Sequence, residues 1–177
     1  MNAVPAALGP QPRHGAAAFG DVVAEHLDAV YAYLVYLTGD RAAAEDLAAE
    51  TFEKAFRSWR RFDPRRGAPR AWLCRIAHSA AVDWFRAEAR RQRREETYVR
   101  EGPEVEETVF AEGLSPELER ALRRLTPAER EAVALRVLLE LDGPTAAKVL
   151  GISPTACSTR LSRALKRLEE EIGHVPH

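Results

Sequence analysis

The sequence predicts an all-α protein made of two small helical domains joined by a flexible acidic linker. Apolar residues recur at the spacing of helix faces through most of the chain, and no segment alternates like a strand. Residues 95–113 lack a sustained apolar period and contain two glycines and a proline, which is typical of a linker. A chain of 177 residues with 46% hydrophobic side chains has material for one ordinary domain or two small ones. Residues 1–18, rich in Ala, Pro and Gly, are predicted to be disordered.

The first domain, residues 19–94, is predicted to contain three helices. Gly39 is suited to end the first helix, and Asp40 can cap the N-terminus of the second. An Asp-Pro step and a glycine within residues 61–68 indicate a loop. Pro69 fits the first turn of a third helix that runs to about Arg94. The apolar stripe of the first helix consists of Val23, Leu27, Val30, Leu34 and Leu37.

The second domain, residues 114–173, begins with clear helix caps. Ser115-Pro116 opens one helix, and Thr126-Pro127-Ala128-Glu129 forms a capping box with proline at the first helical position. We expect the helix that starts there to run to about Leu141. A short helix over 145–150, a turn at Gly151 and a last helix from Pro154 to about Ile172 complete the domain.

The formal net charge of −1 conceals four blocks of alternating sign. Residues 19–53 hold eight acids against one base, and residues 95–119 hold nine acids against one base. Residues 54–94 hold 13 bases against three acids, whereas residues 120–177 are weakly basic. A basic block of this size is the electrostatic footprint of phosphate binding, and an acidic block suits a basic protein surface. The plainer interpretation of any single block is a solvated helix face.

A helix-turn-helix is predicted near the C-terminus, over residues 145–168. Gly151 supplies a turn that needs positive φ, while Ile152 and Leu161 can fill the small core between the two helices. The second helix would present its first residues to a major groove. An ordinary helical hairpin is the alternative. The candidate DNA-binding residues are Thr155, Ser158, Thr159, Arg160, Arg163 and Arg167.

The third helix of the first domain combines arginines with aromatic residues. Arginines bind phosphates, and exposed aromatic faces stack on unpaired bases, so this combination favours single-stranded or melted DNA. The alternative is that Trp72, Trp84 and Phe85 belong to the core, which we favour for Trp72 and leave open for the other two. The arginines involved are Arg75, Arg86, Arg90, Arg91, Arg93 and Arg94.

The second helix carries acidic residues on one side and apolar residues on the other. Leu47, Ala48, Ala55 and the phenylalanines lie opposite the acids, so the helix could dock on a basic protein. A solvated amphipathic helix is the simpler alternative. The acidic residues are Glu45, Asp46, Glu50 and Glu53.

Four stretches together resemble a bacterial RNA polymerase sigma factor of the extracytoplasmic-function (ECF, group IV) type. They are AEDLAAETFEKAFRSW, PRAWLCRIAHSAAVDWFR, LTPAEREAVALR and the helix-turn-helix, and they span about residues 19–171 in the order of that family. The resemblance implies a region 2 domain, an acidic linker and a region 4 domain. It also implies that the protein binds core RNA polymerase, directs it to −10 and −35 promoter elements and is controlled by an anti-sigma factor.

The resemblance also implies roles for particular residues. The residues that the resemblance assigns to polymerase binding are Glu45, Asp46, Glu50, Thr51, Phe52 and Lys54. Reading of the melted −10 element falls to His78, Ser79, Asp83, Trp84, Arg86 and Arg90. Reading of the −35 duplex falls to Thr155, Ser158, Thr159, Arg160, Arg163 and Arg167. The acidic linker would lie in the basic RNA exit path and mimic nucleic acid.

The sequence departs from the family pattern at several of these places. Ala49 stands where many relatives have Gln, and Ser79 where many have Asn. Thr145-Ala146-Ala147 replaces the usual Glu-Ile-Ala, and the start of the recognition helix, residues 155–159, lacks the usual lysine. Losing a phosphate contact mainly weakens positioning, so we expect a reduced dependence on the −35 element, or help from another protein.

Other classes of protein fit the sequence poorly. The five histidines are scattered, no Walker loop or nucleophile-base pair is evident, and Cys74 and Cys157 are too far apart for a zinc knuckle. We therefore expect no enzyme, no cofactor and no metal, and buried free thiols. No apolar run is long enough to span a membrane, so we expect a cytoplasmic protein. The alternatives to a sigma factor are a degenerate sigma-like adaptor and a helix-turn-helix regulator without its own promoter specificity.

Overall fold

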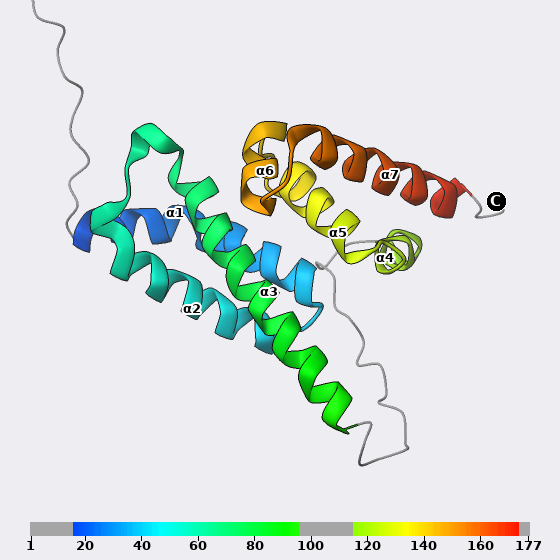
Figure 1. The fold of residues 1–177 in the computed structure, drawn as a ribbon, viewed down its shortest axis with the longest axis horizontal. Coiled ribbons are helices and arrows are strands. Elements are labelled where there is room, and N and C mark those ends of the chain that lie inside the picture. The colour runs from blue at the N-terminus through cyan, green and yellow to red at the C-terminus, as the bar shows by residue number, and fades with distance from the viewer. Residues whose placement is uncertain (1–15, 96–114, 174–177) are drawn as a thin grey trace, which may run out of the picture.

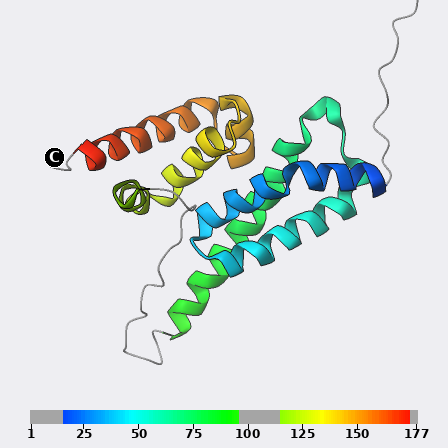
Figure 2. The same cartoon turned by 180° about the vertical axis from the view of Figure 1, so that it is seen from behind.

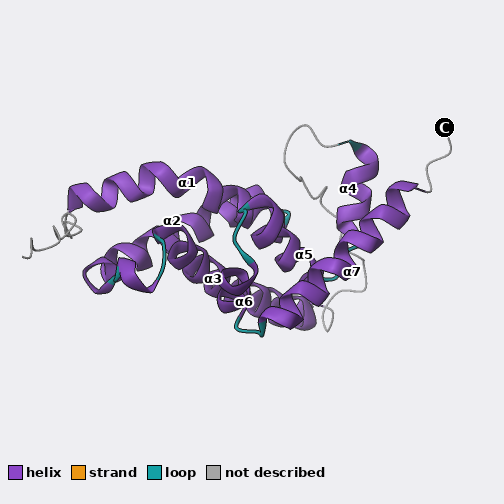
Figure 3. Cartoon of the chain, turned by 90° about the horizontal axis from the view of Figure 1, so that it is seen from above, coloured by secondary structure: helices purple, strands orange, loops and turns teal. Residues whose placement is uncertain are grey.

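A computed structural model describes residues 16–95 and 115–173 of the chain. Within these two ranges every regular element is helical, as Figure 3 shows, and this confirms the all-α prediction. The expected disordered segment 1–18 and the linker 95–113 lie mostly outside the described residues. The described residues of these two segments are helical. The first helix starts at Ala16, within the first segment, and the third helix ends at Glu95, the first residue of the second segment.

The first domain is a bundle of three helices whose ends follow the predicted capping signals. Gly39 adopts a φ of 68°, and its backbone N–H donates to the Val35 carbonyl over 2.8 Å, which ends the first helix. The Asp40 carboxylate then accepts from the backbone N–H of Ala43 over 3.0 Å. The elements are α1 (Ala16–Thr38), α2 (Arg41–Ser58), two 3₁₀ turns η1 (Trp59–Arg61) and η2 (Pro64–Arg66), and α3 (Pro69–Glu95).

The second domain contains the predicted capping box and helix-turn-helix. The Thr126 hydroxyl accepts from the Glu129 backbone N–H, and the Glu129 carboxylate accepts from the Thr126 N–H, so both halves of the box are formed. Gly151 has a φ of 66° and makes the turn between the last two helices. The elements are α4 (Pro116–Arg123), α5 (Pro127–Val133), the π-helical segment η3 (Ala134–Leu138), α6 (Gly143–Leu150) and α7 (Pro154–Gly173).

The helix expected from Pro127 to about Leu141 changes geometry halfway. After Val133 the chain forms a π-helical turn, in which the Leu139 N–H donates to the Ala134 carbonyl over 3.0 Å. A π-turn holds one extra residue, so it rotates the side chains that follow it relative to the core. Leu139 is buried, while Val137 and Leu138 are exposed. The α-helical prediction was therefore wrong for this turn.

The two domains pack against each other and share a continuous core. Figures 1 and 2 show α6 beside α3, and these two helices are in contact. The helix α1 contacts both α5 and the segment η3 that follows it. The largest fully buried side chains come from both halves. They include Tyr33, Leu34 and Leu73 in the first domain and Leu135, Leu139 and Cys157 in the second.

Candidate polymerase-docking and nucleic-acid surfaces

The acidic surface predicted on α2 is exposed while the two domains are packed against each other, an arrangement that we call closed. Leu47, Ala48 and Ala55 are buried against the core, so the opposite side of the helix faces solvent. Two i,i+4 salt bridges support the helix, Lys54 to Glu50 and Arg57 to Glu53, each with an N–O distance of 2.5 Å. The exposed acids that define this acidic surface are Glu45, Asp46, Glu50 and Glu53.

Two residues assigned to polymerase binding are less accessible than the rest. Thr51 is wholly buried, and its hydroxyl donates to the Leu47 carbonyl over 2.7 Å. This correction has a simple cause, because Thr51 lies four residues after Leu47 and four before Ala55 on the buried side. Phe52 is half-buried against the core, whereas Phe56 is 55% exposed, with its ring centroid 5.3 Å from that of Phe19. The sequence pattern places the phenylalanines on the apolar side of this helix, but Phe56 is mostly exposed.

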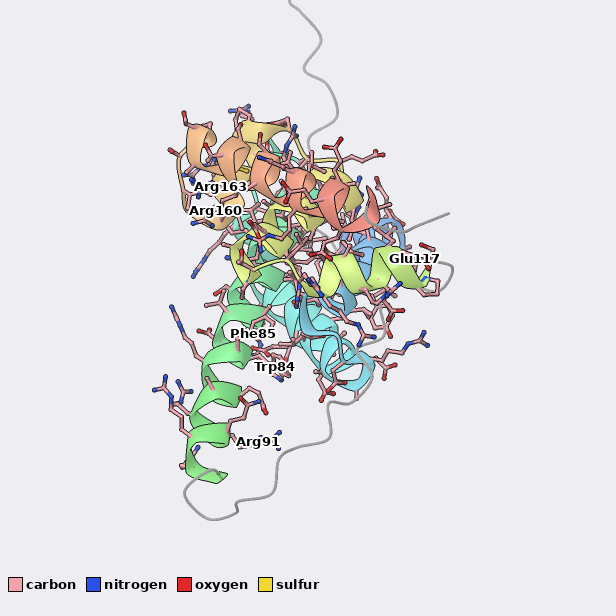
Figure 4. All side chains as sticks on the ribbon, turned by 90° about the vertical axis from the view of Figure 1, so that its right-hand side faces the viewer. Trp84, Phe85, Arg91, Glu117, Arg160 and Arg163 are labelled. Carbon is pink, nitrogen blue, oxygen red and sulfur yellow. The ribbon has the colours of Figure 1, made fainter. Side chains whose placement is uncertain are left out.

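The outer half of α3 protrudes beyond the bundle and carries most of the predicted −10 residues. Figure 4 shows Trp84, Phe85 and Arg91 along this part of the helix. The indole of Trp84 is half-buried against the core, while Phe85 is 40% exposed. Their rings meet edge to face, with centroids 5.0 Å apart. Arginines surround this aromatic pair. The exposed candidates here are Ser79, Asp83, Arg86 and Arg90.

His78 differs from the other −10 candidates because it lies between the two domains. Its Nδ1 is 3.4 Å from the hydroxyl oxygen of Tyr33 on α1 and 4.0 Å from a carboxylate oxygen of Glu131 on α5. Burial lowers the pKa of His78, and the Glu131 charge opposes that shift in part. Burial also raises the pKa of Tyr33 well above its usual range, so the phenol stays neutral. A residue predicted to read the −10 element is thus covered by the second domain.

This environment makes the closed arrangement sensitive to pH. Because the pKa of His78 is lowered from 6.5 when the domains are packed, an open form binds the proton first as the pH falls below about 6.5. The packing is fully stable above that pH and weakens below it. We expect the radius of gyration, measured by X-ray scattering, to increase between about pH 7.5 and about pH 5.5.

His78→Gln is expected to remove most of this pH response. His26→Gln is the matched control, because burial also lowers the pKa of His26, which lies on α1 inside the first domain. An unchanged pH response in His78→Gln would contradict the assignment.

The start of α7 presents the predicted −35 residues on an open surface. Cys157 and Ala164 are buried, and Ile152 and Leu161 pack on the same core, which orients the helix as predicted. Both cysteines are free and buried, as expected for structural thiols. The exposed members of the predicted set are Thr155, Ser158, Thr159, Arg163 and Arg167.

Two arginines of the predicted −35 set are less available. The Arg167 Nε is 3.4 Å from a carboxylate oxygen of Glu129, the capping-box residue of α5. Arg160 is half-buried. Figure 4 shows Arg160 and Arg163 on the same helix. Arg163 is therefore the principal exposed cation among the six residues assigned to the −35 element.

Sequence reasoning missed a cluster of cations near the start of α3. Arg61, Arg66 and Arg70 precede the predicted −10 residues and face α6 across a cavity. The count of 13 bases in residues 54–94 included them, but no local spacing singled them out. Their position opposite α6 depends on the packing of the two domains.

Comparisons with known proteins agree with this architecture. The family profiles for Sigma-70 region 2 and Sigma-70, region 4 match residues 22–91 and 115–168. The chain is 36% identical over 155 residues to the ECF RNA polymerase sigma factor BldN of Streptomyces coelicolor, covering 85% of this chain and 59% of BldN. It is 34% identical to the RNA polymerase sigma factor CarQ of Myxococcus xanthus, covering 89% of this chain and 91% of CarQ.

Solved structures show the same fold. The sigma factor RpoE of Bartonella quintana, in complex with the anti-sigma factor NepR, superposes with a TM-score of 0.74 at 24% identity, covering 89% of this chain and 98% of RpoE. CnrH, in complex with the cytosolic domain of CnrY, gives a TM-score of 0.65 at 25% identity and covers 92% of each chain.

The first of the two helical domains carries an acidic helix and a basic-aromatic helix, and the second carries a helix-turn-helix. Together with the matches above, these features define a transcription initiation factor of the sigma-70 class. The chain belongs to the ECF group of RNA polymerase sigma factors. None of the described helices is both long and apolar enough to cross a bilayer. Within residues 16–95 and 115–173, no three His, Cys, Asp or Glu residues are grouped to hold a metal ion.

Proposed function

We propose that this chain docks on core RNA polymerase through the acidic surface of α2 and directs it to −10 and −35 promoter elements. The arrangement of the first domain carries the proposal, because α2 exposes acids while the neighbouring α3 exposes arginines beside Trp84 and Phe85. A helix-turn-helix repressor has no need of an acidic docking helix next to a basic-aromatic one. The protein would act in the cytoplasm as an initiation factor, not as an enzyme.

The two promoter elements require the domains to separate. Elements about 25 base pairs apart lie about 85 Å apart along B-DNA. A compact chain of 177 residues has a radius of gyration of only about 16 Å. The connection 96–114 spans about 65 Å when extended, so it allows such a separation. The closed arrangement therefore corresponds to a form not engaged with a promoter, and opening uncovers His78.

An anti-sigma factor is the proposed regulator of this chain. RpoE was solved in complex with the anti-sigma factor NepR, and CnrH in complex with the cytosolic domain of CnrY. Here Leu27 on α1 and Val137 and Leu138 on η3 are large, exposed apolar side chains in two elements that contact each other. A partner that covers both elements would hold the domains together and prevent the opening described above.

Run-off transcription with purified core polymerase tests the proposed function. The templates are a genomic library from the same cell, transcribed with and without the protein. We expect new discrete transcripts that share upstream elements. Tight binding to core without transcripts would instead support a degenerate adaptor. If neither binding nor transcripts are observed, the sigma proposal fails and a helix-turn-helix regulator remains.

A further inference from the structure

A cavity of about 500 Å³ lies between the two domains. The turn η2 and the start of α3 form one wall, and the loop before α6 together with α6 itself forms the other. Figures 1 and 3 both show α6 beside α3, and the two helices are in contact. The volume falls within the range of pockets that hold small organic ligands. Because both domains supply walls, the cavity exists only in the closed arrangement.

The walls of this cavity carry an excess of positive charge. The first domain supplies four arginines and the second a lysine, and no salt bridge joins any of these five to another residue of the described part of the chain. They are Arg61, Arg66, Arg70, Arg75 and Lys148. The cations repel one another, and an anion in the cavity is favoured by the net positive charge of the lining.

Most of the acidic groups in the walls already have other partners. Asp63 accepts from the Arg65 backbone N–H over 3.0 Å, which caps η2. Asp142 accepts from both the backbone N–H and the hydroxyl of Thr145, at 2.8 and 2.9 Å, which caps α6. Glu140 is the remaining carboxylate of the lining. Capping does not remove the charge of a carboxylate, so the three acids leave the lining with a net excess of two positive charges.

Arg70 has an unsatisfied donor beside the cavity. Its Nε is buried and has no hydrogen-bond partner among the described residues. A buried guanidinium nitrogen without a partner is unfavourable, and such groups are rare in folded proteins. Because that nitrogen has almost no accessible surface, a ligand in the cavity would contact Arg70 through its other guanidinium nitrogens, and a phosphate oxygen is the acceptor that best suits them.

The cavity also has an aromatic wall. The half-buried indole of Trp72 and the ring of Phe62 both line it, with their centroids 4.9 Å apart. A flat base packs well against such a surface, and arginines add cation–π contacts. Phosphate-binding cations next to an aromatic face indicate a ligand that has both phosphates and a base.

We propose that this interdomain cavity binds a nucleoside polyphosphate. The cations of the first domain and Lys148 hold the phosphates, and Trp72 contacts the base. Since the site needs both domains, the ligand binds the closed arrangement and opposes opening. Such a ligand would reduce the fraction of protein able to engage core polymerase and a promoter, and its binding requires neither of them.

Calorimetric titration of the full chain with ATP tests the site, with pyrophosphate and adenosine as comparison ligands. Saturable binding is expected for ATP, weaker binding for pyrophosphate and none for adenosine. Arg66→Gln and Lys148→Gln are each expected to weaken ATP binding by about tenfold, the usual effect of removing one charge-assisted contact. Both side chains are exposed at the rim, so these variants should fold.

The matched controls are Arg65→Gln and Lys166→Gln, because these exposed cations lie outside the cavity lining. They are expected to bind ATP as the unmodified chain does. Equal weakening in the controls, or no saturable binding of ATP, would overturn the site. Equal affinity for pyrophosphate and ATP would overturn the role of Trp72 and the base.

X-ray scattering tests the coupling between the ligand and the closed arrangement. ATP is expected to keep the radius of gyration at its closed value under acidic conditions that open the free protein. An increase that ATP does not prevent would overturn the coupling. Both measurements use the protein without polymerase, so their failure is distinct from a failure to direct transcription.

Discussion

Reversing two charges at the start of α2, with Glu45→Lys and Asp46→Lys together, is expected to lower promoter-directed transcription by about 100-fold or more. Both side chains are exposed and belong to the acidic surface. If a basic polymerase surface docks there, each substitution replaces an attraction with a repulsion and also slows the encounter of the two proteins. The measurement is run-off transcription at constant ionic strength, together with the dissociation constant for core polymerase.

The matched control places the same charge change on α1, with Asp21→Lys and Asp28→Lys. These acids are exposed too, and they alter the net charge of the chain equally. We expect the control to retain core binding within about threefold, because long-range charge effects are screened at physiological salt. Equal losses in both double variants would mean that net charge matters and the α2 surface does not. Thermal unfolding of both variants checks that the first domain stays intact.

Most helix ends could be predicted because their signals are local. Gly39 and Asp40 stop one helix and start the next, and the Thr126 capping box and Gly151 act in the same way. Each signal depends on backbone groups within a few residues, so a single sequence is enough to reveal it.

The π-helical turn in η3 could not be predicted, because the local pattern is uninformative there. Apolar residues occur at nearly every position from Ala132 to Leu141, so several helical registers bury similar surface. Leu135 and Leu139 are both buried, but residues four apart share a face in an α-helix as well, so their spacing does not choose the register, and we infer that packing against α1 makes the selection. That selection depends on a domain far away in the sequence.

The candidate site was predictable in part for the same reason. The exposure of Glu45 and Glu50 follows from helical spacing. The burial of Thr51 follows from the same spacing, because it places Thr51 on the side of Leu47 and Ala55. The family resemblance, and not the spacing, had assigned Thr51 to the docking surface. The covering of His78 and the cation-lined cavity arise from contacts between domains, which no local pattern encodes.

The recognition helix offers few groups that discriminate between bases. The exposed side chains of its first turns are hydroxyls, and the Thr159 hydroxyl already donates to the Thr155 carbonyl over 2.9 Å. Bidentate reading of a base edge needs Arg, Asn or Gln, and Arg163, two turns into the helix, is the exposed arginine here that is free of the Glu129 contact. Residues 155–159 contain no lysine, so we expect one phosphate contact fewer than in relatives that have a lysine there.

Scrambling the −10 element of a cognate promoter is therefore expected to abolish transcription, whereas scrambling the −35 element should lower it by only about tenfold. A mismatched base pair usually costs about 1–3 kcal/mol where side chains read its edge, and α7 has few such side chains.

Arg163→Ala should weaken binding about equally for intact and scrambled −35 sequences and reduce the salt slope by about one, as expected for a phosphate contact. Arg167→Ala is the control, since Arg167 pairs with Glu129 and its loss should lower the unfolding temperature of the second domain instead. Complete loss of transcription on −35 scrambling would contradict the weak-reading hypothesis and assign base-specific contacts to the hydroxyls of this helix.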